Sequence, residues 1–106
     1  MANPSNPSPA PYLVQADPLV LPLVPDYLKN RAADLPKLDA AVAAGDFAVL
    51  RKLGHNMRGS AGAYGLPPLS DIGARMEDAA VLRDSAAVAD AVAAMRAFLP
   101  TVKLPT

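Results

Sequence analysis

The sequence predicts an all-α protein, an antiparallel up-and-down four-helix bundle with a short N-terminal lid helix. Apolar side chains recur every three or four residues along most of the chain, which is the spacing of amphipathic helices. No stretch of useful length alternates in the manner of a strand. Hydrophobic residues make up 52% of the 106 residues and charged residues 19%, a balance that favours a folded core in a single domain.

The N-terminal segment differs in composition from the rest of the chain. Residues 1–16 are predicted to be a flexible proline-rich lead, because several prolines stand there among Ser and Asn. Asp17 and Pro18 have the pattern of a helix N-cap followed by the first helical residue. We therefore expect a short lid helix over residues 18–21, whose apolar side chains cover one end of the core. Residues 17–106 form the predicted helical domain.

Four amphipathic segments make up the predicted bundle. The first contains Pro36, which removes a backbone hydrogen bond, but the apolar spacing continues through it and predicts one kinked helix. Gly45 ends this helix, and Asp46 is the natural N-cap of the next. The predicted helices cover residues 25–44, 46–65, 67–82 and 85–99. Their core stripes are Leu28, Ala32, Leu35, Leu38 and Val42; Leu50, Leu53, Met57, Ala61 and Tyr64; Leu69, Ile72, Met76 and Ala79 or Ala80; and Val88, Val92, Met95 and Leu99.

The second of these helices carries the only histidine of the chain, His55. At roughly 100° per residue, the apolar stripe of this helix points away from His55. The residues within roughly 60° of the histidine are instead small or basic. They are Ala48, Arg51, Lys52, Arg58, Gly59 and Gly62. We therefore expect an imidazole that is exposed to solvent, with cations and glycines around it.

The small and basic residues around His55 would stabilise an anionic group attached to the ring. A phosphoryl group carries a charge of roughly −1.5 to −2 near neutral pH, and Arg58, one turn after His55, can donate charge-assisted hydrogen bonds to it. Glycine in a helix costs about 1 kcal/mol relative to Ala, so Gly59 and Gly62 on the histidine face indicate access to the ring. Gly54, at the edge of the apolar face, indicates close approach of another helix.

Composition excludes several other functions. The chain has one His and no Cys, so it cannot form disulfides, a thiolate nucleophile or a His/Cys-rich metal site. A formal net charge of zero gives no indication of nucleic-acid binding. No apolar run has the length needed to cross a bilayer, and the N-terminus lacks the pattern of a secretory signal. We expect a cytoplasmic monomer with no nucleic-acid or membrane partner.

The stretch from His55 to Ala61, HNMRGSA, resembles the H-x-x-[K/R]-G-[S/A]-[S/A] signature of histidine-containing phosphotransfer (HPt) domains. The likeness extends over about residues 17–99. It implies a four-helix bundle in which His55 accepts a phosphoryl group from an aspartyl-phosphate receiver domain and passes it to another receiver. By the same resemblance Arg58, where Lys is commoner, steadies the phosphoryl group, and Gly59 leaves the ring accessible.

The resemblance also implies the partners. These are the receiver domains of a response regulator and of a hybrid histidine kinase, which supply the aspartate and a divalent metal. The chain itself is then a carrier and no enzyme, without a cofactor and without autokinase activity, because it has no ATP-binding segment. The residues expected to meet the partner beside His55 are Ala48, Arg51, Lys52, Gly62 and Leu66, with Tyr27 and Leu28 on the preceding helix.

One alternative from a different functional class stays open. The chain could be a helical docking module that binds a receiver or sensor kinase without carrying phosphate. Such a module would keep an apolar contact surface but would need neither an exposed histidine nor glycines beside it. Binding that persists without His55, together with no transfer from any donor, would favour this alternative.

Overall fold

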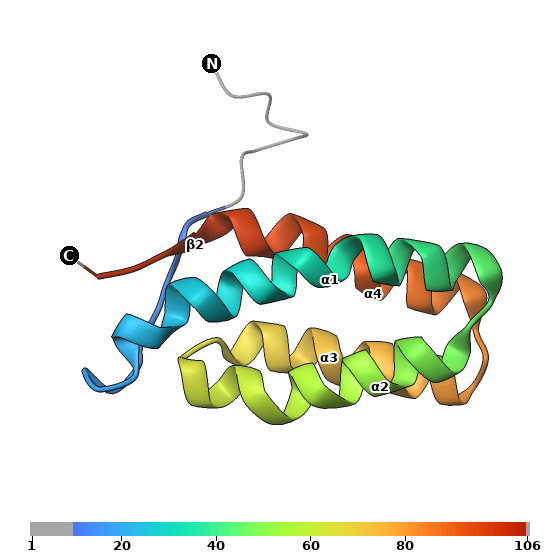
Figure 1. Ribbon diagram of the computed structural model, residues 1–106, viewed down its shortest axis with the longest axis horizontal. Helices are drawn as coiled ribbons and strands as arrows, with labels where there is room; N and C mark the ends of the chain where they lie inside the picture. Colours follow the sequence, from blue (N-terminus) through green and yellow to red (C-terminus); the bar gives the residue numbers. More distant parts are fainter. Residues whose placement is uncertain (1–9, 106) are drawn as a thin grey trace, which may run out of the picture.

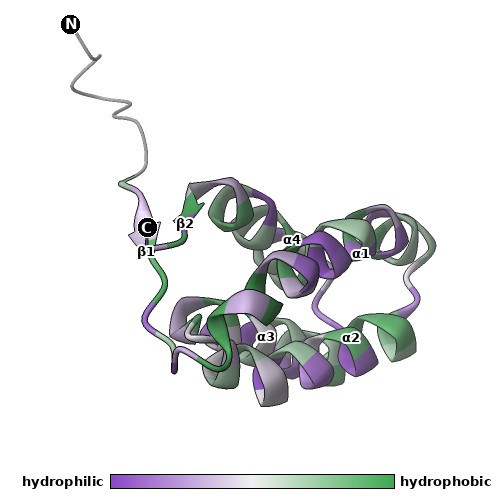
Figure 2. Ribbon diagram, turned by 60° about the vertical axis from the view of Figure 1, so that its left-hand side comes forward, coloured by the Kyte–Doolittle hydropathy of each residue, from purple (hydrophilic) through white to green (hydrophobic). Residues whose placement is uncertain are grey.

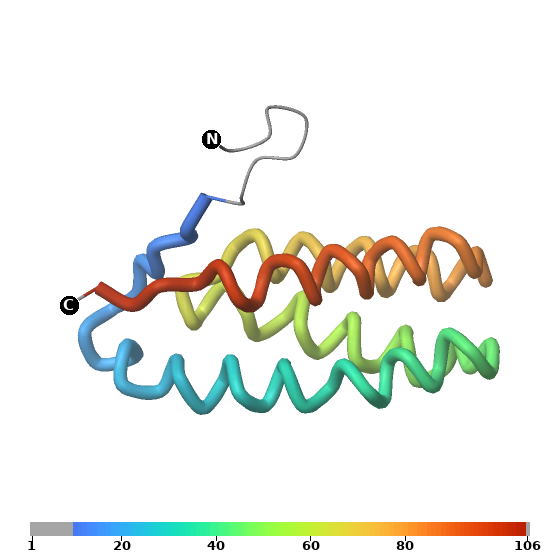
Figure 3. Tube along the Cα trace, turned by 90° about the horizontal axis from the view of Figure 1, so that it is seen from above, coloured from blue at the N-terminus to red at the C-terminus, as the bar shows by residue number. Residues whose placement is uncertain are grey.

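Four helices form the body of the molecule in the computed structural model, which describes residues 10–105. They are α1 (Val24–Ala44), α2 (Phe47–Ser60), α3 (Pro67–Val81) and α4 (Ser85–Phe98). The helices lie side by side as a bundle (Figure 1), which confirms the predicted all-α fold. In Figure 3 the chain turns back between α1 and α2 at the end of the bundle that lies away from residues 10–23.

The helix ends follow from local chemistry. Gly45 ends α1 in the left-handed conformation, with φ 66°, and the Asp46 side chain caps α2 by accepting a hydrogen bond from the Val49 N–H at 3.2 Å. Pro36 lies inside α1, which the structure assigns as one continuous helix. After Ser60 the chain tightens into a 3₁₀ helix, η2 (Ala61–Tyr64), so the predicted second helix is divided into α2 and η2.

The core lies between the helices and contains the apolar stripes predicted for α2, α3 and α4. Their buried members include Leu50, Met57 and Ala61; Leu69, Ile72 and Met76; and Val88, Val92 and Met95. The stripe of α1 differs from the prediction. Tyr27 and Asp34 are buried, and Ala32 is exposed. Asp34 can be buried because its carboxylate accepts a 2.9 Å hydrogen bond from Arg31 Nε. Apolar spacing alone cannot reveal a buried polar residue that has its own partner.

The chain segment before α1 is more ordered than predicted. Strand β1 (Tyr12–Leu13) pairs in parallel with β2 (Val102–Lys103), and Figure 2 shows the two strands together at one end of the molecule. Val14 is only 2% exposed and belongs to the core. Residues 12–14 are therefore held against the domain, by strand pairing and by the burial of Val14, which differs from the flexible lead that was predicted. Residues 1–9 of the predicted lead lie outside the described residues.

The predicted lid helix over residues 18–21 is wrong in position. The chain forms a turn there, stabilised by a 2.8 Å hydrogen bond from the Leu19 N–H to the Asp17 carboxylate, and a 3₁₀ helix, η1 (Leu21–Leu23), follows. Leu19 is 86% exposed, but Val20 and Leu21 are half-buried and pack against the core, as expected of the lid. Val24, at the start of α1, is fully buried. Two prolines in six residues favour such short turns over a regular helix.

Helices α2 and α3 approach one another closely through two glycines. A Cβ atom on Gly54 would lie 2.8 Å from the Glu77 backbone N and 2.9 Å from the Gly73 carbonyl O. A Cβ atom on Gly73 would lie 2.6 Å from the Arg58 backbone N. Only glycine allows backbones to meet at this distance, and the prediction that Gly54 permits a close helix approach is confirmed. The contact sets Glu77 of α3 beside the turn of α2 that carries His55.

Candidate functional site

His55 projects from the outer face of α2, and its side chain is 68% exposed. Its Nδ1 atom lies 2.8 Å from Oε2 of Glu77 on α3, whose side chain is only 13% exposed. An ionised carboxylate can only accept hydrogen bonds, so Nδ1 carries the proton. In the neutral ring this leaves the lone pair on Nε2, the nitrogen that is not bonded to Glu77. The ring is therefore oriented, with one nitrogen held and the other available for nucleophilic attack.

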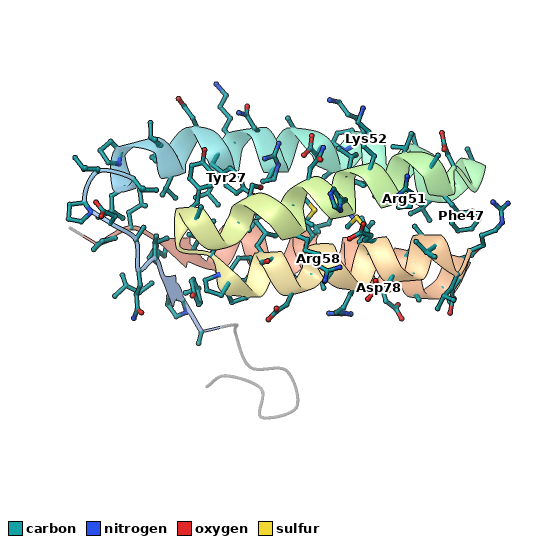
Figure 4. The ribbon with its side chains drawn as sticks, turned by 90° about the horizontal axis from the view of Figure 1, so that it is seen from below. Tyr27, Phe47, Arg51, Lys52, Arg58 and Asp78 are labelled. Carbon is teal, nitrogen blue, oxygen red and sulfur yellow. The ribbon has the colours of Figure 1, made fainter. Side chains whose placement is uncertain are left out.

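Arg58 shares the same carboxylate. Its Nη1 donates to Oε1 of Glu77 at 3.3 Å, and its side chain is 55% exposed. Figure 4 shows Arg58 on the side of α2 that faces α3. Desolvation raises the pKa of Glu77, but the hydrogen bonds and charges of His55 and Arg58 outweigh it, so this pKa lies below its usual value. Glu77 is therefore charged at neutral pH.

The glycines on the histidine face leave open space. A Cβ atom added to Gly59 or to Gly62 would meet no other atom within 4 Å. Nothing in the packing of the described residues therefore requires glycine at these positions, in contrast to Gly54. Access to the ring remains the interpretation of both residues.

Of the other predicted site residues, the structure exposes some on the surface of α2 and buries one in the core. Ala48, Arg51 and Lys52 are exposed on α2, and Figure 4 places Lys52 toward α1, on the side of α2 opposite to Arg58. Within the described part of the chain, neither Arg51 nor Lys52 forms an ion pair. Leu66 is fully buried, with 0% exposure, so its assignment to a contact surface is wrong. It precedes Pro67 at the start of α3 and packs into the core there.

Glu77 is the residue that the sequence interpretation missed. The sequence places cations around His55, but it does not reveal which residue of another helix meets them. One signal was present, because Glu77 follows Gly73 by one helical turn, and Gly54 already indicated a close helix contact. Pairing the two glycines would have brought Glu77 to the histidine.

Two further features are absent from residues 10–105. No group of three or more His, Cys, Asp or Glu side chains in this range could hold a metal ion. Within the same range, no helix is both long enough and apolar enough to span a membrane.

The exposed histidine and the carboxylate that orients it lie on a bundle of four helices. The chain belongs to the Hpt domain family, whose model matches residues 23–103. Comparison with curated proteins and with solved structures gives no match. Membership assigns the chain a phosphotransfer role in two-component signalling, in which Hpt domains act as carriers and interact with receiver domains.

Proposed function

We propose that the chain is a phosphorelay carrier in which Nε2 of His55 accepts a phosphoryl group from one receiver domain and passes it to another. The observation that supports this most directly is the 2.8 Å contact between Nδ1 and Glu77, on a ring that is 68% exposed. The contact fixes the tautomer in which Nε2 is the nucleophile. The exposure lets a second protein bring its phosphorylated aspartate to that atom.

The transfer step balances without a further reactant. The Nε2 lone pair forms a bond to phosphorus while the bond from phosphorus to the aspartyl oxygen breaks, and the aspartate leaves as a carboxylate. The histidine becomes an N-phosphorylated imidazolium, with its Nδ1 proton still held by Glu77. The negative charge of Glu77 stabilises this cation. Transfer to a second aspartate reverses the same step.

The neighbouring residues of α2 have separate roles in this proposal. Arg58 is placed to turn from Glu77 toward the phosphoryl oxygens and to bind them through its N–H groups. Gly59 leaves space for the incoming group. Ala48, Arg51, Lys52 and Gly62 lie on the surface that would meet the receiver.

Most of the transition-state stabilisation would come from the receiver, with its aspartate and divalent metal. The absence of autokinase activity, the absence of a cofactor in this chain, the monomeric state and the cytoplasmic location stay predictions.

The test is to incubate the protein with a phosphorylated receiver domain. We expect the label to move to the protein and to survive alkali but not acid, as a phosphohistidine does, while the receiver loses its own label. A label that alkali removes, or no label from any receiver of the source organism, would overturn the proposal. If binding of the receiver were then still detected, the docking module without phosphate would be the better interpretation.

Replacing Glu77 by Gln is expected to slow phosphoryl transfer by about tenfold, by analogy with the loss of the carboxylate that orients a metal-ligating histidine. An amide can either accept from Nδ1 or donate to it, so the tautomer is no longer fixed. The measurement is the initial rate of labelling from a phosphorylated receiver. Asp78→Asn removes the same charge from the next, exposed residue and serves as the control. Equal rates in both variants would contradict the role of Glu77.

The Glu77→Gln variant should also change the pH dependence of the protein's stability. Because the pKa of Glu77 is lowered in the folded protein, its charge stabilises the fold above the pKa of an unfolded glutamate. That stabilisation is lost as the pH falls through the lowered pKa. Acidification should therefore lower the thermal midpoint of the natural protein more than that of Glu77→Gln.

A further inference from the structure

Helix α3 holds Arg58 at three points, of which the proposed function uses only one. The side chain of Arg58 contacts Glu77, its backbone lies against Gly73, and its carbonyl oxygen accepts a 2.7 Å hydrogen bond from the Ser70 hydroxyl. We propose that Ser70 is a positioning residue for phosphoryl transfer, which fixes the backbone of Arg58 so that the guanidinium reaches the phosphoryl group on His55. The inference rests on the proposed function and adds to it the residue that places Arg58.

The three contact residues of α3 lie on one face of that helix. Ser70, Gly73 and Glu77 are three and four residues apart, which is the spacing of neighbours along one side of an α-helix. In the described part of the chain, the side-chain hydrogen bonds that join α2 to α3 all have His55 or Arg58 as one partner. The polar side-chain contacts between these two helices are therefore concentrated at the site.

The Arg58 carbonyl lies in the last turn of α2, just before the chain changes its helical form. Helix α2 ends at Ser60, and the last turn of an α-helix contains carbonyl groups that have no partner within the helix. The hydroxyl of Ser70, a half-buried residue, supplies a donor to the carbonyl of Arg58. Ser70 is itself anchored at the start of α3, because its N–H bonds to the Leu66 carbonyl at 3.2 Å. The bond therefore ties the end of α2 to a fixed point.

The bond from Ser70 does not depend on where the Arg58 side chain points. In the free protein Nη1 of Arg58 lies 3.3 Å from Oε1 of Glu77, a long hydrogen bond made by a side chain that is 55% exposed. When the guanidinium turns toward the phosphoryl oxygens, it gives this contact up. The bond to the Arg58 carbonyl is present in both states. Ser70 therefore holds the base of the side chain while its end changes partner.

The backbone next to Arg58 makes this bond more important. Gly59 follows directly, and glycine restrains the backbone less than any other residue. A Cβ atom on Gly59 would meet nothing within 4 Å, so packing does not fix this position either. A misplacement of about 1 Å in a reacting site can slow a reaction by about a hundredfold. The Ser70 bond limits such a displacement of Arg58.

The experiment removes the Ser70 hydroxyl alone. In Ser70→Ala we expect the initial rate of labelling from a phosphorylated receiver to fall by about fivefold, because Arg58 is displaced by only part of an ångström. Ser70→Thr keeps a hydroxyl on the same carbon and should be labelled within about twofold of the natural rate.

Thr101→Val is the matched control. It removes another 2.7 Å bond from a hydroxyl to a carbonyl, in this case the carbonyl of Phe98 at the end of α4. We expect Thr101→Val and Ser70→Ala to lower the thermal midpoint by a similar amount, about 5 °C. Only Ser70→Ala should slow phosphoryl transfer, measured well below both midpoints.

A double-mutant cycle with Arg58→Ala distinguishes positioning from a role in folding. If Ser70 acts through the guanidinium, Ser70→Ala should slow the natural protein but change the rate of Arg58→Ala by less than about twofold. The slower reaction of Arg58→Ala is followed at a higher receiver concentration. Equal slowing by Ser70→Ala in the two backgrounds would overturn the inference.

The outcomes separate this inference from the proposed function. Labelling of Ser70→Ala at the natural rate would overturn the role of Ser70 and leave the carrier function intact. Slow labelling of Ser70→Thr, at the rate of Ser70→Ala, would do the same, because the hydroxyl would then not be what matters. If the natural protein takes no phosphoryl group from any receiver, the carrier function is overturned, and the role of Ser70 with it.

Discussion

Replacing His55 by glutamine should abolish the phosphoryl label, both from a phosphorylated receiver and from phosphoramidate, a small molecule that phosphorylates histidine with release of ammonia. The amide nitrogen of glutamine has no lone pair available for attack on phosphorus, so the chemistry is lost. The same amide can still donate to Glu77, the partner that lies 2.8 Å from His55 Nδ1. Because His55 is exposed on a helix that is otherwise unchanged, we expect the fold and its stability to survive. The variant therefore removes the nucleophile and little else.

Two measurements accompany this variant. The bound label is quantified after acid and alkali treatment, and the affinity for an unphosphorylated receiver is measured by titration. We expect the label to fall to background and the affinity to stay within about threefold, because one side chain at the centre of a small interface is replaced by another of similar size. A label that persists in His55→Gln would place the phosphoryl group on another residue and would contradict the central proposal.

Gly73→Ala should destabilise the protein strongly, although it adds a single methyl group. That methyl would lie 2.6 Å from the Arg58 backbone N and 2.7 Å from the Gly54 carbonyl O. Backbone atoms in the middle of a helix cannot turn aside as a flexible side chain can, so α2 and α3 have to separate. We expect the free energy of unfolding to fall by about 2 kcal/mol, even after the gain in helix propensity. In a domain of this size that corresponds to a thermal midpoint roughly 10 °C lower.

Gly59→Ala is the matched control for this prediction. It makes the same change on α2, at a position where the new methyl meets nothing within 4 Å. We expect its stability to be unchanged or raised by up to about 1 kcal/mol. Thermal and denaturant unfolding of both variants measure the difference. Equal losses, or no loss in Gly73→Ala, would show that the glycine contact is not what sets the distance between the helices.

Gly73→Ala should also affect the site while the protein is still folded. Glu77 is on α3 and His55 on α2, so separating the helices lengthens the 2.8 Å contact on which the orientation of the imidazole depends. Phosphoryl transfer measured well below the unfolding temperature should therefore be slower in this variant than in the natural protein. The change resembles that of Glu77→Gln in its cause, since both weaken the orientation of the imidazole by Glu77.

Much of the fold could be predicted because periodicity is a local property. In α2, α3 and α4 the apolar residues lie on one face and polar residues on the other, so spacing alone identifies the core. In α1 the same method placed Ala32 inside, because alanine suits either face. Strands β1 and β2 have two residues each, too few for any alternation to be visible. Their pairing depends on a contact between distant parts of the chain.

The candidate site could be predicted in part for the same reason. His55, Arg58 and Gly59 follow one another within two turns of one helix, and the helical repeat is enough to place them on one face. Glu77 comes from another helix, and finding it requires the distance and register between α2 and α3. Leu66 shows the opposite error. It is close to His55 in the sequence, but it lies at the turn into α3, where the chain leaves the helical pattern and the side chain enters the core.

The pairing of β1 with β2 has a consequence for the order of folding. Almost the whole chain separates Tyr12 from Val102, so the entropy lost in closing this contact is large unless other elements have already brought the two segments together. The helices do so when they pack. It follows that the strands join late in folding and separate early in unfolding. Val14 is then buried only when the strands join, at the end of folding. Amide hydrogen exchange should then be faster at Val14, whose N–H donates to the Lys103 carbonyl at 3.0 Å, than in the middle of α2.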